Sequence, residues 1–357
     1  MFIVRGESPY DERMLPLTLD AAKRNVAQLL ALAVEHTDES AAVVAWDAQC
    51  DLAIGLAQAY LHCLPNATSI EFDSVEREQV LSAFDRLKRG DLVVLIESTR
   101  FSLAKFRFRM ELFKRSLKVI EHPHLARMTA DECGKYVDSL AYDPDYFRGV
   151  GYALKERIDR ACEAVIVGGP EQLIFSGELE AAKLNIGDYR EMKNVGGQFP
   201  IGEVMTEAKK LSSLSGRALV SSYGDKSFQV RKLDAPMTLI IEEGLVAGVE
   251  NATEEFEQVL ADIKADEGKI WVREFGLGMN RAFSESETVT DMGTYERMCG
   301  VHLSLGAKHH MFPKAEIKKK DARHHVDVML VSDSVQIDGE EVFRNGAWLV
   351  QADPGSY

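Results

Sequence analysis

Short apolar runs alternate with amphipathic segments through the first half of the chain. Apolar residues recur at helical spacing over 20–35, which predicts a helix, and the run 92–97 is continuously apolar, which predicts a buried strand. The same patterns predict strands at 41–46, 69–72 and 117–120, and helices at 50–63, 75–89 and 103–116. Strands that alternate with helices are typical of a parallel sheet covered on both faces.

The pattern changes after about residue 190. β-branched runs at 237–241 and 269–272 predict strands, with a helix candidate at 251–266 between them. Glu243-Gly244 and Asp338-Gly339 separate apolar pieces in the manner of tight hairpin turns. We therefore predict an α/β protein with a Rossmann-like parallel-sheet domain at residues 1–190 and a β-rich α+β domain at residues 191–357.

The first domain lacks the usual nucleotide-binding signatures. No predicted strand is followed by GxGxxG at the start of a helix, and GxxxxGK[ST] is absent from the sequence. The glycines after the apolar run 164–167 are followed by Pro170, so we interpret them as a turn. We expect a dinucleotide-type fold that binds no dinucleotide.

Charge and composition limit the partners. The 42 basic residues against 57 acidic residues give a formal charge of −15, which repels phosphate backbones and anionic membranes. We expect neither nucleic acid nor a membrane as partner, and the acidic start does not fit a secretory signal. Five cysteines without CxxC spacing are typical of reduced thiols, so we expect a cytoplasmic protein.

Five of the nine histidines lie between His302 and His325. Residues two apart in a strand share a face, so we expect His325 and Asp327 to point the same way and His324 to point away. An imidazole beside a carboxylate can supply two ligands of a divalent metal. This pair is the strongest functional candidate in the sequence.

Further carboxylates and one imidazole could complete a metal site. The candidate set offers four carboxylates and two imidazoles: Glu203, Glu274, Glu296, His302, His325 and Asp327. Such a set can hold two divalent ions through bridging carboxylates. Two ions ~3.5–4 Å apart can activate a hydroxide and polarise a carbonyl oxygen.

Each candidate also has an ordinary structural interpretation. Glu203 and Glu296 could be surface acids, and His302 could be a hydrogen-bonded core histidine. Glu274 interrupts an apolar strand and therefore needs a partner. That partner could be a metal ion, or it could be the guanidinium of Arg273 or Arg281. The ordered occurrence of all the candidates favours the metal site.

The order of these segments resembles one known family. FPIGEV, REFGLG, GVHLSLG and HVDVML resemble the PxGEV loop, GE strand end, H[IL]ALG stretch and HxD of the aminopeptidase T-like leucyl aminopeptidases, which are dimetal exopeptidases. The resemblance covers about residues 190–345. It implies that the metal positions are Glu203, Glu274, Glu296, His302, His325 and Asp327.

The chain departs from this family at two places. Its peptidases often have a tyrosine shortly after the H[IL]ALG stretch, thought to assist at the carbonyl, whereas residues 306–310 here contain His309 and His310 and no tyrosine. His309 could take that role, or both histidines could be exposed loop residues. Glu296 also differs from the family's DEK acid in its spacing and in the residues before it.

The resemblance implies a metallo-aminopeptidase, a hydrolase that removes N-terminal residues from peptides through a metal-activated hydroxide. We expect zinc, cobalt or manganese as cofactor, a peptide or other small molecule as substrate, and a homo-oligomer. The catalytic residues we expect are Glu203, Glu274 and His309, with one of the two carboxylates handling the proton.

A second branch of the superfamily suggests an alternative. The chain is also similar to the dihydroxypyridine ring-cleaving dioxygenases, which use one non-haem Fe(II). There the position of Glu274 is a histidine and the side chains at Glu296 and His302 are lost, whereas this chain keeps them. A third alternative is a degenerate member that binds a peptide and holds no metal.

Overall fold

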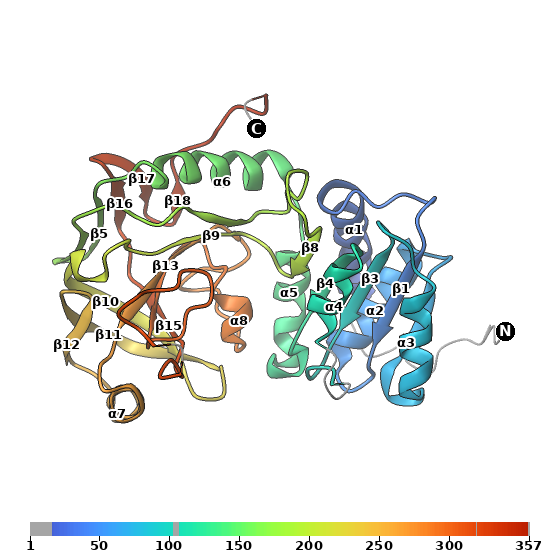
Figure 1. Cartoon of the computed structure of the whole chain (residues 1–357), viewed down its shortest axis with the longest axis horizontal. Helices are drawn as coiled ribbons and strands as arrows, with labels where there is room; N and C mark the ends of the chain where they lie inside the picture. The colour runs from blue at the N-terminus through green and yellow to red at the C-terminus, as the bar shows by residue number, and fades with distance from the viewer. Residues whose placement is uncertain (1–15, 103–106, 319, 356–357) are drawn as a thin grey trace. The chain divides into compact units, whose positions relative to one another are not determined.

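The computed structural model describes residues 16–102, 107–318 and 320–355. The chain forms two compact units (Figure 1). Unit 1 contains the described residues up to Tyr142 together with Gly187–Pro200, and unit 2 contains Asp143–Ile186 and Ile201–Tyr357. Residues 143–186, which the sequence analysis assigned to the first domain, fold with unit 2 because their strands pair with strands of that unit.

A five-stranded parallel sheet forms the centre of unit 1, in the order β2-β1-β3-β4-β8. The strands are β1 (Ala42–Trp46), β2 (Thr68–Glu71), β3 (Leu92–Ile96), β4 (Lys118–His122) and β8 (Gly196–Gln198). Every residue of β3 is buried, as its continuous apolar run predicts for a strand covered on both faces.

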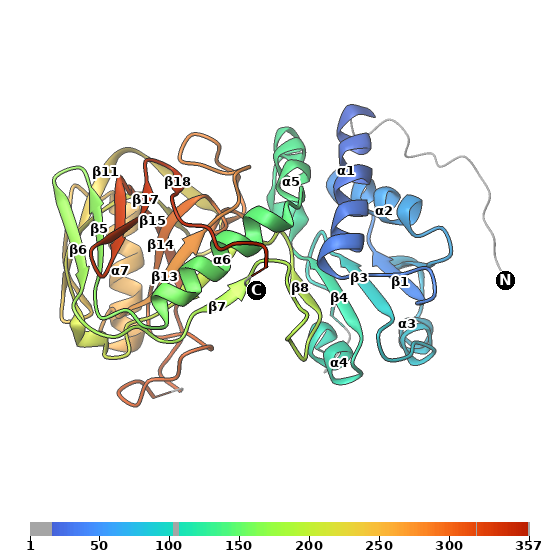
Figure 2. The same cartoon turned by 90° about the horizontal axis from the view of Figure 1, so that it is seen from above.

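Helices cover both faces of this sheet. The helices of unit 1 in the described residues are α1 (Pro16–Gln28), η1 (Leu29–Ala33), α2 (Asp51–Cys63), η2 (Phe72–Ser74), α3 (Arg77–Asp85), α4 (Phe108–Lys114), η3 (Leu125–Arg127), η4 (Ala130–Glu132) and α5 (Cys133–Ser139). Figure 2 shows α1, α2 and α5 on one side of the sheet and α3 and α4 on the other. Val93 and Val119 of the sheet pack with Phe84 and Leu112 of α3 and α4.

The predicted Rossmann-like layering of the first half is therefore confirmed. The helix predicted at 103–116 is described from Phe108, and residues 103–106 lie outside the described part of the chain.

Unit 2 is built on one antiparallel sheet of thirteen strands among the described residues. Its strands are β5 (Ala164–Gly168), β6 (Glu171–Phe175), β7 (Lys183–Asn185), β9 (Glu203–Thr206), β10 (Leu214–Gly224), β11 (Val230–Glu242), β12 (Leu245–Glu250), β13 (Val272–Gly278), β14 (Gly300–Leu305), β15 (Val326–Leu330), β16 (Ser334–Ile337), β17 (Glu340–Arg344) and β18 (Ala347–Trp348). The β-rich second half predicted from the sequence is confirmed.

Turns and helices of unit 2 follow their sequence signals. Both predicted hairpins have positive φ at both central residues, 48° and 75° at Glu243-Gly244 and 48° and 80° at Asp338-Gly339, as a type I′ turn requires. The helical elements are η5 (Leu211–Ser213), α6 (Pro144–Ile158), α7 (Glu254–Glu267) and α8 (Met292–Tyr295). Among the described residues, no helix combines the length and the apolar character that a membrane crossing requires.

Candidate metal centre

Neighbouring strands of unit 2 bring the candidate ligands to one face of the sheet. Strands β15, β14, β13 and β9 lie next to one another in that order. Their register pairs each of three ligands with a small residue: Glu203 with Gly278, His302 with Gly276, and Asp327 with Ser304. Paired residues, and residues two apart along a strand, project from the same face. The register therefore places these three ligands on a common surface.

Glycine on β13 makes room for the imidazole on β14. A Cβ atom added to Gly276 would lie 2.1 Å from ring atoms of His302. Glu274, two residues before this glycine, lies where the ladder between β13 and β14 shifts register, between Val272 and Phe275. Such an irregularity re-aims the side chains at it. The glycine and the irregular register thus allow a carboxylate and an imidazole to approach each other.

All six predicted ligands come together in this region. They form three groups whose candidate ligand atoms lie within 4.8 Å of one another: Glu203, Glu274 and His302; Glu274, His325 and Asp327; Glu296, His302 and Asp327. Glu274, His302 and Asp327 each belong to two groups. The groups therefore overlap and share ligands.

His325, directly before β15, lies beside Asp327 of that strand. His325 Nε2 lies 3.1 Å from Asp327 Oδ1 and 3.6 Å from Glu274 Oε2. His324 points elsewhere and lies with its Nε2 atom 2.7 Å from Asp266 Oδ2. The adjacent histidines thus have different carboxylate partners, although both lie just before β15 and not within it.

The buried histidine of β14 lies between two carboxylates. His302 Nε2 is 3.4 Å from Glu203 Oε1 and 3.8 Å from Glu274 Oε1, and the imidazole is 1% exposed. Among the described residues, neither ring nitrogen of His302 has a hydrogen bond, and Glu203 Oε2 and Asp327 Oδ1 have ion-pair contacts with Arg297 and His325 but no hydrogen bond. Buried polar atoms without hydrogen bonds are costly unless another group satisfies them. These atoms fit the donor set of a bound cation.

The carboxylates dominate the electrostatics of the site. Burial alone would lower the pKa of His302, but the adjacent Glu203 and Glu274 raise it well above its usual value. Burial also opposes the charged form of His325, yet Asp327 raises its pKa to about 10. The negative charge of the surrounding carboxylates therefore favours the protonated form of both imidazoles. The same charge favours a bound metal cation.

Arg297 is a further cation inside this cluster, which the sequence motifs did not indicate. Its Nη1 atom lies 3.2 Å from Glu203 Oε2 and also forms an ion pair with Glu296. Burial raises the pKa of Glu296 to about 8, with Arg297 acting in the opposite direction. The available signal in the sequence was a basic residue directly after the candidate ligand Glu296.

The loop after β14 places an imidazole against Glu274. His309 Nε2 lies 3.1 Å from Glu274 Oε2, and its ring stacks on Phe312 with centroids 5.3 Å apart and planes at 3°. The His309 side chain is 4% exposed, so it is not an exposed loop residue, whereas His310 is exposed. His309 is thus in position to exchange a proton with Glu274.

The arginine next to Glu274 supports the site from outside. Arg273 is buried and forms an ion pair with Glu207 instead of with Glu274, and Arg281 pairs with Asp143 at 3.3 Å. Glu274 is therefore not the ion-pair partner of either arginine.

Arg273 also anchors the loop that carries His309. It donates hydrogen bonds to the backbone carbonyls of Ala307 at 2.6 Å and Phe312 at 2.7 Å. These carbonyls lie on either side of His309 in the chain, so the guanidinium holds both ends of the loop.

Comparisons with known proteins place the chain by its fold. No family model and no curated protein matches the sequence. A structure of 2,5-dihydroxypyridine dioxygenase from Pseudomonas putida KT2440 superimposes with a TM-score of 0.62 at 15% identity, covering 96% of this chain and 100% of that one. AmpT from Thermus thermophilus superimposes with a TM-score of 0.57 at 12% identity, covering 93% of this chain and 99% of that one. The chain has the fold shared by these two proteins, which represent both branches that its motifs resemble.

Proposed function

We propose that this chain is a divalent-metal-dependent aminopeptidase, a hydrolase that removes N-terminal residues from peptides. The observation that carries the proposal is the convergence of six side chains into three overlapping ligand groups in which three residues are shared. Shared ligands suit two ions held close together. The similarity in fold to AmpT supports the same class of reaction.

Zinc, cobalt or manganese ions held by the six side chains would supply Lewis acidity and an activated water. The chain's own contribution is proton handling. Glu203 or Glu274 would take a proton at a carboxylate oxygen, and Glu274 is the better placed because His309 Nε2 lies 3.1 Å from its Oε2 atom. His309 can hold that proton and return it to the departing amine.

Substrate attraction follows from charge. A peptide N-terminus is a cation, and the chain carries a formal charge of −15. The carboxylates of the centre add to this field where the ammonium group would lie. The same charge disfavours polyanionic substrates such as nucleic acids.

The test measures metal content and hydrolysis together. Protein purified without chelators should hold close to two divalent ions per chain and hydrolyse aminoacyl-p-nitroanilides. His325→Ala and Asp327→Ala should each lose metal and at least ~100-fold in kcat/KM, since both supply candidate ligands. His324→Ala is the matched control, because His324 pairs with Asp266 outside the ligand groups. Undiminished turnover by a metal-free Asp327→Ala protein would refute the proposal.

A second function is favoured by one specific observation. The ion pairs of Arg297 engage Glu203 and Glu296, which leaves the group Glu274, His325 and Asp327 as the one without an arginine contact. With His309 beside it, this group offers two imidazoles and two carboxylates, close to the two-histidine, one-carboxylate set that suits non-haem Fe(II). This is the basis for a ring-cleaving dioxygenase as the alternative.

Anaerobic purification separates the two functions. One iron per chain, with oxygen consumption on 2,5-dihydroxypyridine and no release of p-nitroaniline, would establish the oxygenase. Two zinc, cobalt or manganese ions with peptide hydrolysis would establish the peptidase. A protein that binds a peptide without stoichiometric metal would be the degenerate binding member.

A further inference from the structure

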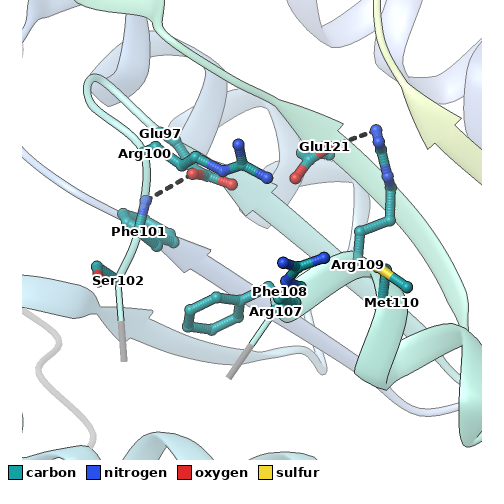
Figure 3. A pocket seen from close by; sticks show the side chains of 9 residues that line it. All are labelled: Glu97, Arg100, Phe101, Ser102, Arg107, Phe108, Arg109, Met110 and Glu121. Carbon is teal, nitrogen blue, oxygen red and sulfur yellow. Dashed lines mark hydrogen bonds and ion pairs between the residues drawn. The ribbon is translucent and has the colours of Figure 1, made fainter. Parts of the chain in front are cut away.

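Unit 1 contains a cavity at the carboxyl ends of β3 and β4. Its volume is about 580 Å³, within the usual range for small-molecule sites. The residues that line it are Glu97, Arg100, Phe101, Ser102, Arg107, Phe108, Arg109, Met110 and Glu121 (Figure 3). None of them belongs to the metal centre. Parallel α/β sheets bind ligands outside the carboxyl ends of their strands.

Three guanidinium groups face this cavity in a chain that is acidic as a whole. Arg109 Nη1 donates to Glu121 Oε2 at 2.6 Å, so one positive charge is neutralised. Among the described residues, the side chains of Arg100 and Arg107 have no hydrogen-bond or ion-pair partner. Two guanidinium groups without counter-charges are a ready site for a carboxylate or phosphate, which they can hold by paired hydrogen bonds.

The second carboxyl group of the cavity does not cancel these charges. Glu97 follows β3 directly, is 1% exposed, and accepts a hydrogen bond from the Phe101 backbone N–H at 2.7 Å. Burial raises the pKa of Glu97 to about 8, with Arg100 acting in the opposite direction, and even a charged Glu97 would leave three arginines against two carboxylates in the lining. The cavity therefore keeps a local excess of positive charge.

Aromatic rings form a fixed apolar wall. Phe101 stacks on Phe72 with centroids 4.1 Å apart and planes at 7°, and Phe108 meets Phe84 edge-on at 6.1 Å. Both wall residues are buried members of the core of unit 1, so the packing beneath holds their rings in place. A ligand with a flat or hydrocarbon body would gain contact area there without reordering the wall.

We propose that this cavity binds a small organic anion. A carboxylate or phosphate group of the ligand pairs with Arg100 and Arg107, and its apolar body lies against Phe101 and Phe108. This site is additional to the metal centre of unit 2 and does not depend on the reaction catalysed there. A polyanion is the wrong ligand, since the net charge of −15 on the whole chain repels extended negative charge.

The test is calorimetric titration of the full-length protein at low salt with benzoate, phenyl phosphate and, as a neutral control, benzyl alcohol. We expect at least one of the two anions to bind with a dissociation constant below about 1 mM and benzyl alcohol not to bind. Arg100→Gln and Arg107→Gln should each weaken binding by about tenfold, because each removes a charge-assisted contact. Higher salt should weaken it as well.

A matched variant excludes a general effect of charge. Arg89→Gln removes the same charge from an exposed arginine of unit 1 that lies before β3, at the opposite end of that strand, and should bind as the wild type does. Circular dichroism and metal content should be unchanged in all three variants. The proposal is overturned if neither anion binds, if Arg100→Gln and Arg107→Gln bind like the wild type, or if Arg89→Gln weakens binding equally. The preference between benzoate and phenyl phosphate identifies the oxyanion.

Discussion

At the scale of single residues, buried charges decide what the metal centre can hold. Arg297 contacts Glu203 and Glu296, two carboxylates that would otherwise repel each other and Glu274. A guanidinium is always charged, so it supplies one positive charge whether or not a metal is bound. The metal-free protein therefore depends on Arg297 for its charge balance.

Arg297→Met should destabilise the metal-free protein by ~3 kcal/mol, because removing one partner leaves buried carboxylates uncompensated. With metal bound, the loss should be smaller, since the ion takes over the compensation. Thermal unfolding with and without added metal measures both values. Arg281→Met, which removes a more exposed arginine, serves as the control, and equal losses in the two metal states would contradict this account.

His122 of unit 1 is a buried imidazole that lies outside the candidate metal centre. Its Nε2 and Nδ1 atoms lie 2.8 Å from the hydroxyls of Tyr60 and Tyr136, so both nitrogens are satisfied. Burial lowers its pKa to about 3. The folded state holds this histidine neutral, whereas the unfolded chain protonates it near pH 6.5.

Stability should therefore fall as the pH drops from about 6.5 towards 3, because the unfolded state binds more protons in that window. At pH 4.5 the contribution of His122 amounts to ~2–3 kcal/mol relative to pH 7. Urea unfolding at both pH values should show a smaller pH effect in His122→Gln than in the wild type. His62→Gln removes an exposed imidazole and should leave the pH effect unchanged.

At the scale of elements, the antiparallel register of β9, β13, β14 and β15 builds the site. Ligands from distant parts of the chain meet because these strands are neighbours, and glycine on β13 leaves space for the ring of His302. The pleat alone places side chains on one face, but the glycine decides how closely they approach. A strand with a larger residue at that position would keep the sheet and lose the cluster.

Gly276→Ala should abolish metal binding while the protein still folds, since the new Cβ would lie 2.1 Å from the His302 ring and force it away. Elemental analysis and circular dichroism measure the two properties. Gly248→Ala on β12 is the matched control, because its Cβ would meet Ile240 Cδ1 at an ordinary 3.6 Å. Full metal occupancy in Gly276→Ala would show that His302 is not a ligand.

At the scale of the whole molecule, the two units have separate cores and separate candidate sites. The metal centre belongs entirely to unit 2 and the arginine-lined cavity entirely to unit 1. A ligand that binds only the folded state stabilises the unit that holds it. Metal should therefore affect the two units differently.

A chelator should lower the unfolding temperature of unit 2 and leave that of unit 1 unchanged. Metal at 100 times its dissociation constant contributes ~2.7 kcal/mol to the folded state. Scanning calorimetry with and without chelator should resolve this as a shift of one transition. Asp327→Ala should show no shift, and a chelator effect that persists in this variant would place the metal elsewhere.

The sequence by itself determined the elements and the candidate ligands. A continuous apolar run located β3, the helix candidate at 251–266 became α7, and Asp-Gly and Glu-Gly marked both hairpins. The spacing of His325 and Asp327 predicted their common face. These features are local, because each strand, helix or turn is determined by residues that are close together in the sequence. The ordered motifs also indicated which distant acids belong with them.

Only the tertiary structure decided how these parts combine. Residues 143–186 join unit 2 through strand pairing that no local pattern encodes. Arg297 enters the metal centre, His309 lies against Glu274 instead of at the surface, and Arg100 and Arg107 line one cavity of unit 1. Contact between such side chains depends on sheet register and burial, which arise only when the whole unit packs.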